Sequence, residues 1–170
     1  GIEINEKNII SSTAALSLDS VPKSLAVIGG GYIGLEMGSV WKRLGSEVTV
    51  IENLSFITPG MDREISNEFQ KILTKQGIKF QLNSKVISIE DLGSGVKIKY
   101  QDNKNNTKNE ILAEKTLIAV GRKPYTEGLN LNKVGVNKDK SGRIKVNKKF
   151  QTKIKNIYAI GDVIEGPMLA

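Results

Sequence analysis

The spacing of hydrophobic and polar residues changes several times along the chain, and each spacing predicts a different element. An apolar run over residues 25–28 leads into a glycine-rich turn, and apolar residues then recur at helical spacing as far as Leu44. This order predicts a strand, a tight turn and a helix that ends at Gly45. Residues 47–52, Glu-Val-Thr-Val-Ile-Glu, predict a second strand that ends in a carboxylate.

A loop containing Pro59 and Gly60 leads to a second predicted helix. Asp62 is the expected N-cap and Gly77 the expected end. Residues 78–82 alternate apolar and polar side chains and predict a third strand, parallel to the first two. The apolar stripe that we expect this helix to bury consists of Ile65, Phe69, Ile72 and Leu73.

The apolar period then becomes two, over residues 86–89, 96–100 and 110–113, which are separated by glycine-rich or polar turns. This pattern predicts an antiparallel meander. Residues 116–121 are apolar almost throughout, as expected of a buried parallel strand that rejoins the first sheet. The expected fold class is therefore α/β, a Rossmann-like parallel sheet with helices and an inserted antiparallel β-meander.

The two ends of the chain have a different character. Residues 1–23 are polar and predict a connecting segment, and residues 24–122 hold the expected nucleotide-binding domain. Glycine and proline punctuate residues 123–170, where only residues 143–146 and 157–160 have the pattern of strands. We expect this last region to be a segment of another kind of domain.

The glycine-rich turn has the pattern G-x-G-x-x-G between a strand and a helix. Gly29 permits a sharp turn, Gly31 permits close approach to a pyrophosphate, and Gly34 permits the helix to pack tightly on its strand. The unpaired N–H groups and the dipole at the helix start favour phosphate. The spacing alone is weak, but its place between strand and helix predicts a dinucleotide site.

Glu52 ends the second strand, eighteen residues beyond Gly34. In a dinucleotide-binding βαβ unit, an acid at this place accepts hydrogen bonds from the adenosine ribose and repels a 2′-phosphate. The alternative is a solvated carboxylate at a strand end. The context favours the first interpretation and predicts NAD, not NADP, as the ligand.

The amino-acid composition excludes several kinds of chemistry for this chain. The chain has no cysteine and no histidine, which excludes thiol–disulfide chemistry, histidine acid–base catalysis and Cys/His metal sites within it. No segment reaches the roughly 18 apolar residues of a membrane span, and the first residues do not resemble a signal peptide. We therefore expect a soluble protein without a membrane or metal partner.

The formal net charge of +7 raises the question of nucleic-acid binding. Residues 133–155 carry nine Lys or Arg and one acid, so the basicity is local. This stretch has no aromatic residue besides Phe150 and no known nucleic-acid motif. A solvated lysine-rich face is the favoured interpretation, with no nucleic-acid partner.

Three stretches together resemble the dihydrolipoyl dehydrogenases, flavin-dependent members of the pyridine nucleotide–disulfide oxidoreductases. They are VIGGGYIGLEMGSVWKRLGSEVTVIE, LIAVGRKP and QTKIKNIYAIGDVIEGPMLA, in the family's order and spacing. The resemblance implies an NAD-binding domain inserted between two pieces of a FAD-binding domain. Residues 123–170 would then be part of the second FAD piece.

The resemblance also assigns site residues. Glu52 would bind the adenosine ribose, Val86 would border the adenine, Gly121 would lie beneath the dinucleotide, and Glu36 would point toward the nicotinamide, unless it is a helix-surface acid without a role. For FAD, Asp162 would bind the ribityl chain, and the backbone of Met168, Leu169 and Ala170 would meet the flavin. The remaining NAD positions, around the pyrophosphate, are Gly29, Gly30, Gly31, Tyr32, Ile33, Gly34 and Leu35.

The implied parent reaction oxidises a dihydrolipoyl group and passes the electrons through FAD to NAD. The family's redox-active cysteine pair and its histidine–glutamate pair do not occur in this chain. The resemblance implies a homodimer that serves lipoyl-bearing proteins of 2-oxo acid dehydrogenase complexes, in a bacterial cytoplasm or a mitochondrial matrix. We expect the chain alone to bind NAD without catalysis.

Two other interpretations remain open. One is another flavoprotein disulfide reductase or NADH oxidoreductase with the same architecture; NADPH-using members carry basic residues near the ribose, where this chain has Glu52. The other is a stand-alone NAD-binding sensor module. A reading frame that continues in both directions, with a C-x-x-x-x-C motif upstream, would favour the enzyme.

Overall fold

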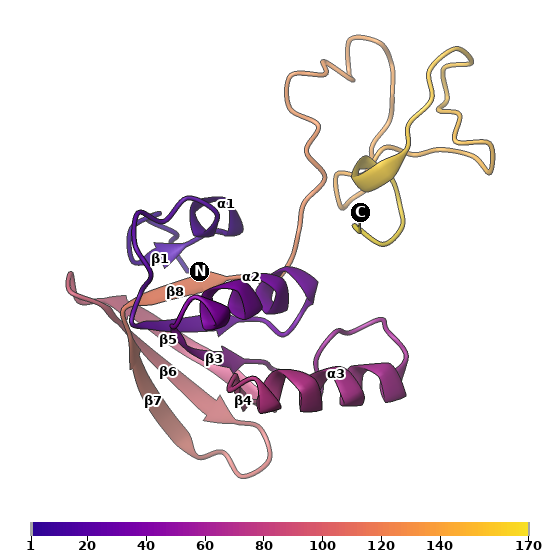
Figure 1. Cartoon of the computed structure of the whole chain (residues 1–170). Coiled ribbons are helices and arrows are strands. Elements are labelled where there is room, and N and C mark those ends of the chain that lie inside the picture. Colours follow the sequence, from indigo (N-terminus) through magenta and orange to yellow (C-terminus); the bar gives the residue numbers. More distant parts are fainter. Residues whose placement is uncertain (1, 170) are drawn as a thin grey trace. The chain divides into compact units, whose positions relative to one another are not determined.

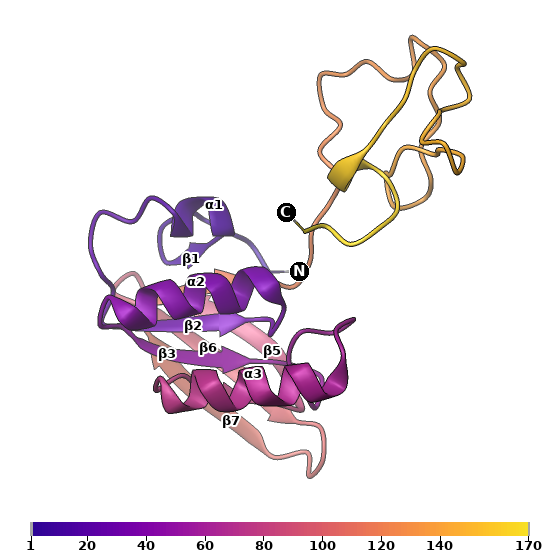
Figure 2. The ribbon, with the colours of Figure 1, turned by 45° about the vertical axis from the view of Figure 1, so that its right-hand side comes forward.

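The computed structural model describes residues 2–169, which fall into two units, one ending at Val120 and one beginning at Gly121. The first unit is built on a five-stranded parallel sheet in the order β1-β8-β2-β3-β4 (Figures 1 and 2). Its strands are β1 (Ile9–Ile10), β8 (Lys115–Ile118), β2 (Ser24–Ile28), β3 (Glu47–Ile51) and β4 (Lys79–Gln81). The predicted parallel sheet is confirmed, including the return of β8 to pair with β2.

A second sheet, three-stranded and antiparallel, follows β4 in the chain. It consists of β5 (Ser84–Asp91), β6 (Val96–Asp102) and β7 (Lys108–Ala113). The predicted meander is thus confirmed, with a register irregularity between Val86 and Ser88. No helix among the described residues is long and apolar enough to cross a membrane.

The parallel sheet has a different partner on each face. Leu25 and Val27 of β2 face a core shared with the helices α2 (Tyr32–Arg43) and α3 (Arg63–Lys75). Ala26 and Ile28 belong to a second core, shared with the antiparallel sheet. Because neighbouring strand residues point to opposite faces, the apolar run of β2 fills both cores.

The helix ends follow the sequence signals. Gly45 and Gly77 follow α2 and α3 with φ of 114° and 91°, values that glycine adopts readily. Asp62 caps α3, its carboxylate accepting from the N–H groups of Glu64 and Ile65 at 2.9 and 3.3 Å. Both helices therefore begin and end close to where the sequence places them.

The expected buried stripe of α3 is wrong for three of its four residues. Leu73 is buried, but Ile65, Phe69 and Ile72 are exposed. The inward position two turns earlier on the same face is Ser66, which is 1% exposed. Its hydroxyl lies 2.8 Å from that of Thr58 and donates to the Asp62 carbonyl at 3.0 Å. A hydrogen-bonded serine therefore takes the place at which the hydrophobic pattern puts an apolar residue.

The segment that precedes β2 contributes more than a connection. Ile9–Ile10 form the edge strand β1 beside β8, and α1 (Ser12–Ala15) follows it. Ile10 and Ala15 are fully buried, and the Trp41 indole N–H of α2 donates to the Ala15 carbonyl at 3.2 Å. A two-residue strand and a four-residue helix are too short to show a period in the sequence.

The second unit is mostly irregular, with a 3₁₀ turn η1 (Gly161–Val163). The strands expected over residues 143–146 and 157–160 are wrong for the described structure, which has only single bridges, Lys138 to Ile144 and Gln151 to Tyr158. The Ile144 N–H donates to the Val163 carbonyl at 2.7 Å, in a turn and not in a strand ladder. A small core joins Val136, Ile144, Ala159 and Ile164.

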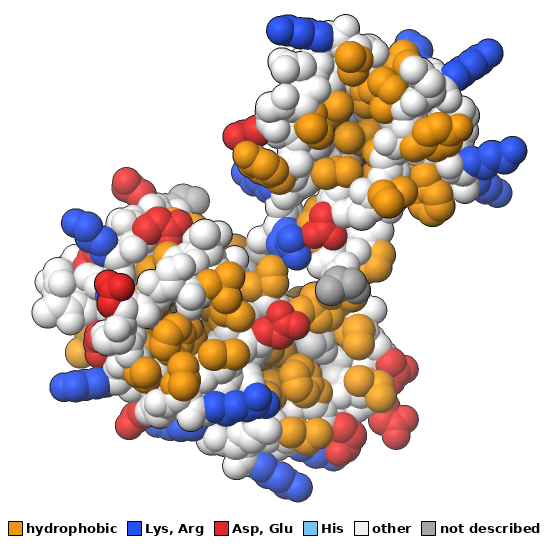
Figure 3. All heavy atoms as spheres, turned by 45° about the horizontal axis from the view of Figure 1, so that its top comes forward, with side chains coloured by type: hydrophobic (Ala, Val, Ile, Leu, Met, Phe, Trp, Pro, Cys, Tyr) orange, Lys and Arg blue, Asp and Glu red, His pale blue; other side chains and the backbone are white. Residues whose placement is uncertain are grey.

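Charge is divided unevenly between the two units. Residues 121–170 hold eleven Lys or Arg and four acids, whereas residues 1–120 hold fourteen of each. Figure 3 shows several of these basic side chains projecting from the second unit. Residues 1–120 are therefore neutral in formal charge, and the excess of positive charge lies in residues 121–170.

Candidate nucleotide-binding site

The glycine-rich turn joins the carboxyl end of β2 to the start of α2. Gly29 has φ of 107°, and its N–H donates to the Ile51 carbonyl of β3 at 2.9 Å. The Gly30 carbonyl accepts from the N–H of Thr58 at 2.7 Å. The turn is therefore held by main-chain bonds to β3 and to the loop before α3.

Two of the glycines have no room for a side chain. A Cβ atom on Gly29 would lie 2.6 Å from the Ala119 carbonyl oxygen. One on Gly34 would overlap the Gly29 carbonyl oxygen and lie 3.0 Å from the Val27 side chain. Gly34 is thus the point of tight packing between α2 and β2, as the motif predicts.

The first turn of α2 presents unpaired N–H groups. Gly31 is the N-cap and has no side chain to accept from them, and the helical bonds begin with the Leu35 N–H donating to the Gly31 carbonyl at 3.1 Å. The N–H groups of Tyr32, Ile33 and Gly34 therefore have no acceptor within the helix. No atom lies within 4 Å of a Cβ placed on Gly31, so an anion can approach this backbone closely.

Glu52 follows β3 and lies against this turn, with a side chain that is nearly buried. Only 9% of the residue is exposed. One carboxylate oxygen, Oε2, accepts from the Gly30 N–H at 2.6 Å, and the other, Oε1, accepts from the Leu54 N–H at 2.7 Å. The structure therefore brings Glu52 and the turn together, as the sequence predicts. The carboxylate is held there by hydrogen bonds from main-chain N–H groups, which the sequence did not reveal.

Four further residues predicted to contact NAD lie along α2. Ile33 is half-buried and Leu35 is buried in the helix–sheet core. Glu36 is exposed, and its carboxylate forms no hydrogen bond or ion pair within residues 2–169. The Tyr32 hydroxyl donates to the Pro59 carbonyl at 3.4 Å, which links the helix start to the following loop.

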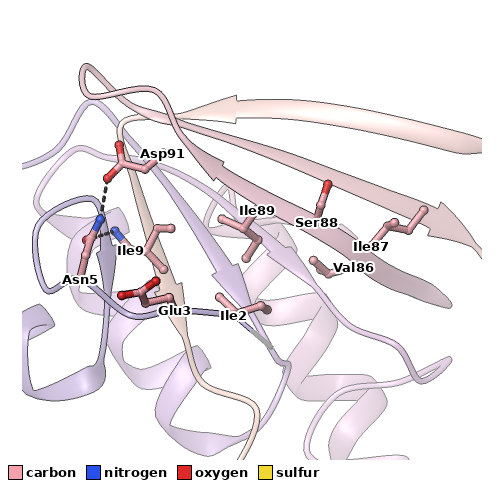
Figure 4. A pocket seen from close by; sticks show the side chains of 9 residues that line it. All are labelled: Ile2, Glu3, Asn5, Ile9, Val86, Ile87, Ser88, Ile89 and Asp91. Carbon is pink, nitrogen blue, oxygen red and sulfur yellow. Dashed lines mark hydrogen bonds between the residues drawn. The ribbon is translucent and has the colours of Figure 1, made fainter.

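Val86 lies on β5 and lines a pocket of about 580 Å³ between the N-terminal segment and the antiparallel sheet. Figure 4 shows Val86 and Ile89 facing this pocket from β5, with Ile2 and Glu3 on the opposite side. At its far end, Asn5 donates to Asp91 at 2.6 Å. A border with adenine remains a prediction for Val86.

The remaining predicted residues belong to the second unit. Asp162 lies in η1, and its carboxylate pairs with the Arg122 guanidinium at 2.7 Å. Arg122 also donates to the Met168 carbonyl at 3.3 Å, so it connects two residues predicted to meet FAD. Gly121 and Leu169 are exposed, and Ala170 lies outside the described residues. Arg122 was not predicted, although it stands in the quoted stretch LIAVGRKP.

The parallel sheet, the glycine-rich turn and the acid after β3 define the Rossmann-like class of α/β folds. The chain belongs to the pyridine nucleotide-disulphide oxidoreductase family, whose match covers residues 2–170. The family predicted from the sequence is therefore confirmed, and it is a family of oxidoreductases.

Several relatives are similar over the whole chain. The mitochondrial dihydrolipoyl dehydrogenase of Pisum sativum is 55% identical over 170 residues, which are 100% of this chain and 34% of that protein. Leghemoglobin reductase of Glycine max is 54% identical over the whole chain and 32% of that protein. The chain thus spans about a third of the length of these relatives.

Solved structures that match this chain are also flavoprotein disulfide reductases. The Cu(II) complex of the HOCl-induced flavoprotein disulfide reductase RclA from Escherichia coli matches with a TM-score of 0.81 and 33% identity. The match covers 95% of this chain and 36% of that one. The fold is therefore that of flavoprotein disulfide reductases.

Proposed function

We propose that residues 24–122, nearly all of which belong to the first unit, are the NAD-binding domain of a flavin-dependent dihydrolipoyl dehydrogenase. The observation that carries this proposal is the junction of the Gly29–Gly34 turn, the uncapped start of α2 and the buried Glu52 carboxylate. A dinucleotide needs this combination, because it offers donors to phosphate and an acceptor to ribose. The relatives named dihydrolipoyl dehydrogenase support the choice of reaction.

The residues of the site have separate roles in this proposal. The N–H groups at the start of α2 hold the pyrophosphate, and the Glu52 carboxylate accepts from the adenosine ribose. Val86 borders the adenine, Gly121 lies beneath the dinucleotide, and Glu36, exposed on α2, faces the nicotinamide. When bound, NAD supplies the hydride acceptor, and the protein orients it.

The second unit is proposed as part of the second segment of a FAD-binding domain. Asp162, Met168, Leu169 and Ala170 would contact the flavin, and Arg122 holds the first two of them together. The residues of this chain can form only part of a FAD-binding site. FAD-binding Rossmann units use a glycine-rich turn of their own, and this chain has a single G-x-G-x-x-G motif, the one at Gly29.

The whole protein would be a homodimer that oxidises lipoyl-bearing proteins of 2-oxo acid dehydrogenase complexes. Relatives named as mitochondrial favour the mitochondrial matrix over a bacterial cytoplasm. The alternative within the family is another flavoprotein disulfide reductase, which the names leghemoglobin reductase and RclA keep open. The two differ in the electron donor, so assays of a complete protein with dihydrolipoamide and with other disulfide-forming donors would separate them.

Calorimetric titration of the purified chain with NAD and with NADP tests the proposed site. A 2′-phosphate beside the Glu52 carboxylate faces like charge, which costs roughly 1–3 kcal/mol, or about five- to hundredfold in affinity. We expect NAD to bind more tightly, and tighter NADP binding would contradict the proposal. The chain has no cysteine or histidine, so we expect no lipoamide-dependent NAD reduction by it alone.

A further inference from the structure

We propose that Glu52 is also a positioning residue, which fixes the glycine-rich turn before any nucleotide binds. This inference rests on the proposed NAD site and adds a second role for the same side chain. The carboxylate spans two loops, one before α2 and one after β3, with one oxygen on the Gly30 N–H and the other on the Leu54 N–H.

The environment of Glu52 explains why these two bonds are needed. The residue is 9% exposed, and none of the ion pairs within residues 2–169 includes it. A nearly buried carboxylate without a cation is costly unless donors surround it. The two main-chain N–H groups, at 2.6 and 2.7 Å, and the adjacent start of α2 supply this stabilisation.

The bonds also fix Gly30 from two sides. Its N–H is held by Glu52, while its carbonyl accepts from the Thr58 N–H at 2.7 Å. A Cβ on Gly30 would lie 3.2 Å from the Glu52 Cγ, so the side chain packs against this peptide. Thr58 is joined to Ser66 of α3 by a 2.8 Å hydroxyl contact. The turn is therefore clamped between Glu52 and a loop anchored to α3.

This arrangement has a consequence for cofactor choice. Each carboxylate oxygen retains a lone pair after accepting one N–H, so ribose hydroxyls can still bind. The side chain cannot rotate away from a 2′-phosphate without breaking both main-chain bonds. The discrimination against NADP is thus preorganised, and removing Glu52 disturbs the phosphate-binding turn as well as the ribose contact.

The first experiment measures amide hydrogen exchange in the nucleotide-free chain. In the wild type, the Leu54 amide should exchange at least about tenfold more slowly than that of its neighbour Asn53, which has no acceptor in the described structure. In Glu52→Gln, the new NH₂ group faces one of the two N–H donors, so Gly30 or Leu54 should lose protection by about tenfold or more. The amides of Val27 and Ile98, in the cores, should keep theirs.

Glu47→Gln is the matched control, because Glu47 is the exposed first residue of β3, the strand that Glu52 follows, and its carboxylate has one ion pair within residues 2–169, with Lys79 at 3.5 Å. It should leave the exchange of Gly30 and Leu54 unchanged. Equal exchange of Leu54 and Asn53 in the wild type would overturn the proposal, and this test needs no variant to fold. Unchanged protection of the Gly30 and Leu54 amides in a folded Glu52→Gln variant would also overturn it.

The second experiment compares NAD with an analogue whose adenosine ribose lacks the 2′- and 3′-hydroxyls. A positioning role predicts that Glu52→Gln weakens both ligands, each by about fivefold or more. A role limited to the ribose predicts a loss for NAD alone, which would overturn the proposal. If the wild type binds neither ligand, the proposed NAD function fails, and the exchange experiment alone decides the positioning role.

Discussion

The carbonyl oxygen of Gly29 occupies the space that a Cβ atom on Gly34 would need. Gly29 lies in the glycine-rich turn and Gly34 in the first turn of α2, so the tight packing of α2 on β2 depends on a contact between this turn and the helix that follows it. The same Cβ would also meet Val27 Cγ1 at 3.0 Å and Ala119 Cβ at 3.3 Å. No rotation of a flexible side chain can relieve this overlap, because its nearest atom is backbone.

Gly34→Ala should therefore destabilise the first unit. Forcing a methyl group into this contact shifts α2 away from β2, at a cost of about 1–3 kcal/mol or more. Urea unfolding followed by the fluorescence of Trp41, which lies on the same helix, measures the change. An unchanged unfolding midpoint would contradict the packing described here.

Gly31→Ala is the matched control within the same motif. Gly31 has φ of −79° and nothing within 4 Å of its Cβ position, so alanine fits the free protein. The unfolding free energy should stay within about 0.5 kcal/mol of the wild type. The methyl group would, however, fill the space proposed for the pyrophosphate, and NAD affinity should fall by about fivefold or more.

A second prediction concerns two neighbouring residues of α3. Leu73 is 2% exposed, whereas Ile72 is 51% exposed. Leu73→Ala should lower the unfolding free energy by about 2–5 kcal/mol, because it leaves a cavity in the helix–sheet core. Ile72→Ala should change it by less than about 0.5 kcal/mol. Equal losses of unfolding free energy in the two variants would contradict this difference in burial and would favour the buried stripe that the sequence predicts.

Much of the first unit was predictable from the sequence, because its elements are long and periodic. The glycine signals place the ends of α2 and α3, and the alternating runs predict β5, β6 and β7. The errors arise where a polar group is buried or where an element is short. Ser66 is inside because Thr58 lies against it, and β1 is too short to have a period.

The position of Glu52 beside the glycine-rich turn was predictable from the sequence, but its hydrogen bonds were not. The spacing of the motif places Glu52 beside the turn, but its two main-chain partners depend on how the loops fold back. The prediction of strands in the second unit was wrong because it, too, depended on how distant parts of the chain come together. Short apolar runs predict strands only where neighbouring strands complete a ladder, and the Ile144 N–H instead finds its acceptor in a turn.

A third prediction concerns flavin. Asp162 is paired with Arg122 at 2.7 Å, and both side chains are partly exposed, so this contact gives little binding energy by itself. Without a second glycine-rich turn, the chain should not retain FAD. The purified protein should be colourless, and added FAD should separate from it in gel filtration. A yellow protein that keeps stoichiometric flavin would contradict this prediction.

Asp91 joins the hairpin between β5 and β6 to the N-terminal segment. Its carboxylate accepts from the Asn8 side chain at 2.9 Å, from the Gly93 N–H at 2.8 Å and from the Asn5 side chain at 2.6 Å. These bonds, the one from Asn8 foremost, hold the pKa of Asp91 below its ordinary value of 3.8. The ionised carboxylate is therefore the form that ties the two segments together.

The fourth prediction is a pH dependence of this connection. A carboxyl group whose pKa is lower in the folded state stabilises the fold above its unfolded-state pKa, and the effect is lost as the pH falls through the folded-state pKa. Asp91→Asn should therefore lower the urea midpoint at pH 7, because the new NH₂ group faces donors from Asn5 or Asn8. The difference from the wild type should shrink below pH 3.8. Glu90→Gln, at the neighbouring exposed position, is the control, and a difference that stays constant from pH 7 to below pH 3.8 would show that Asp91 does not act through its charge.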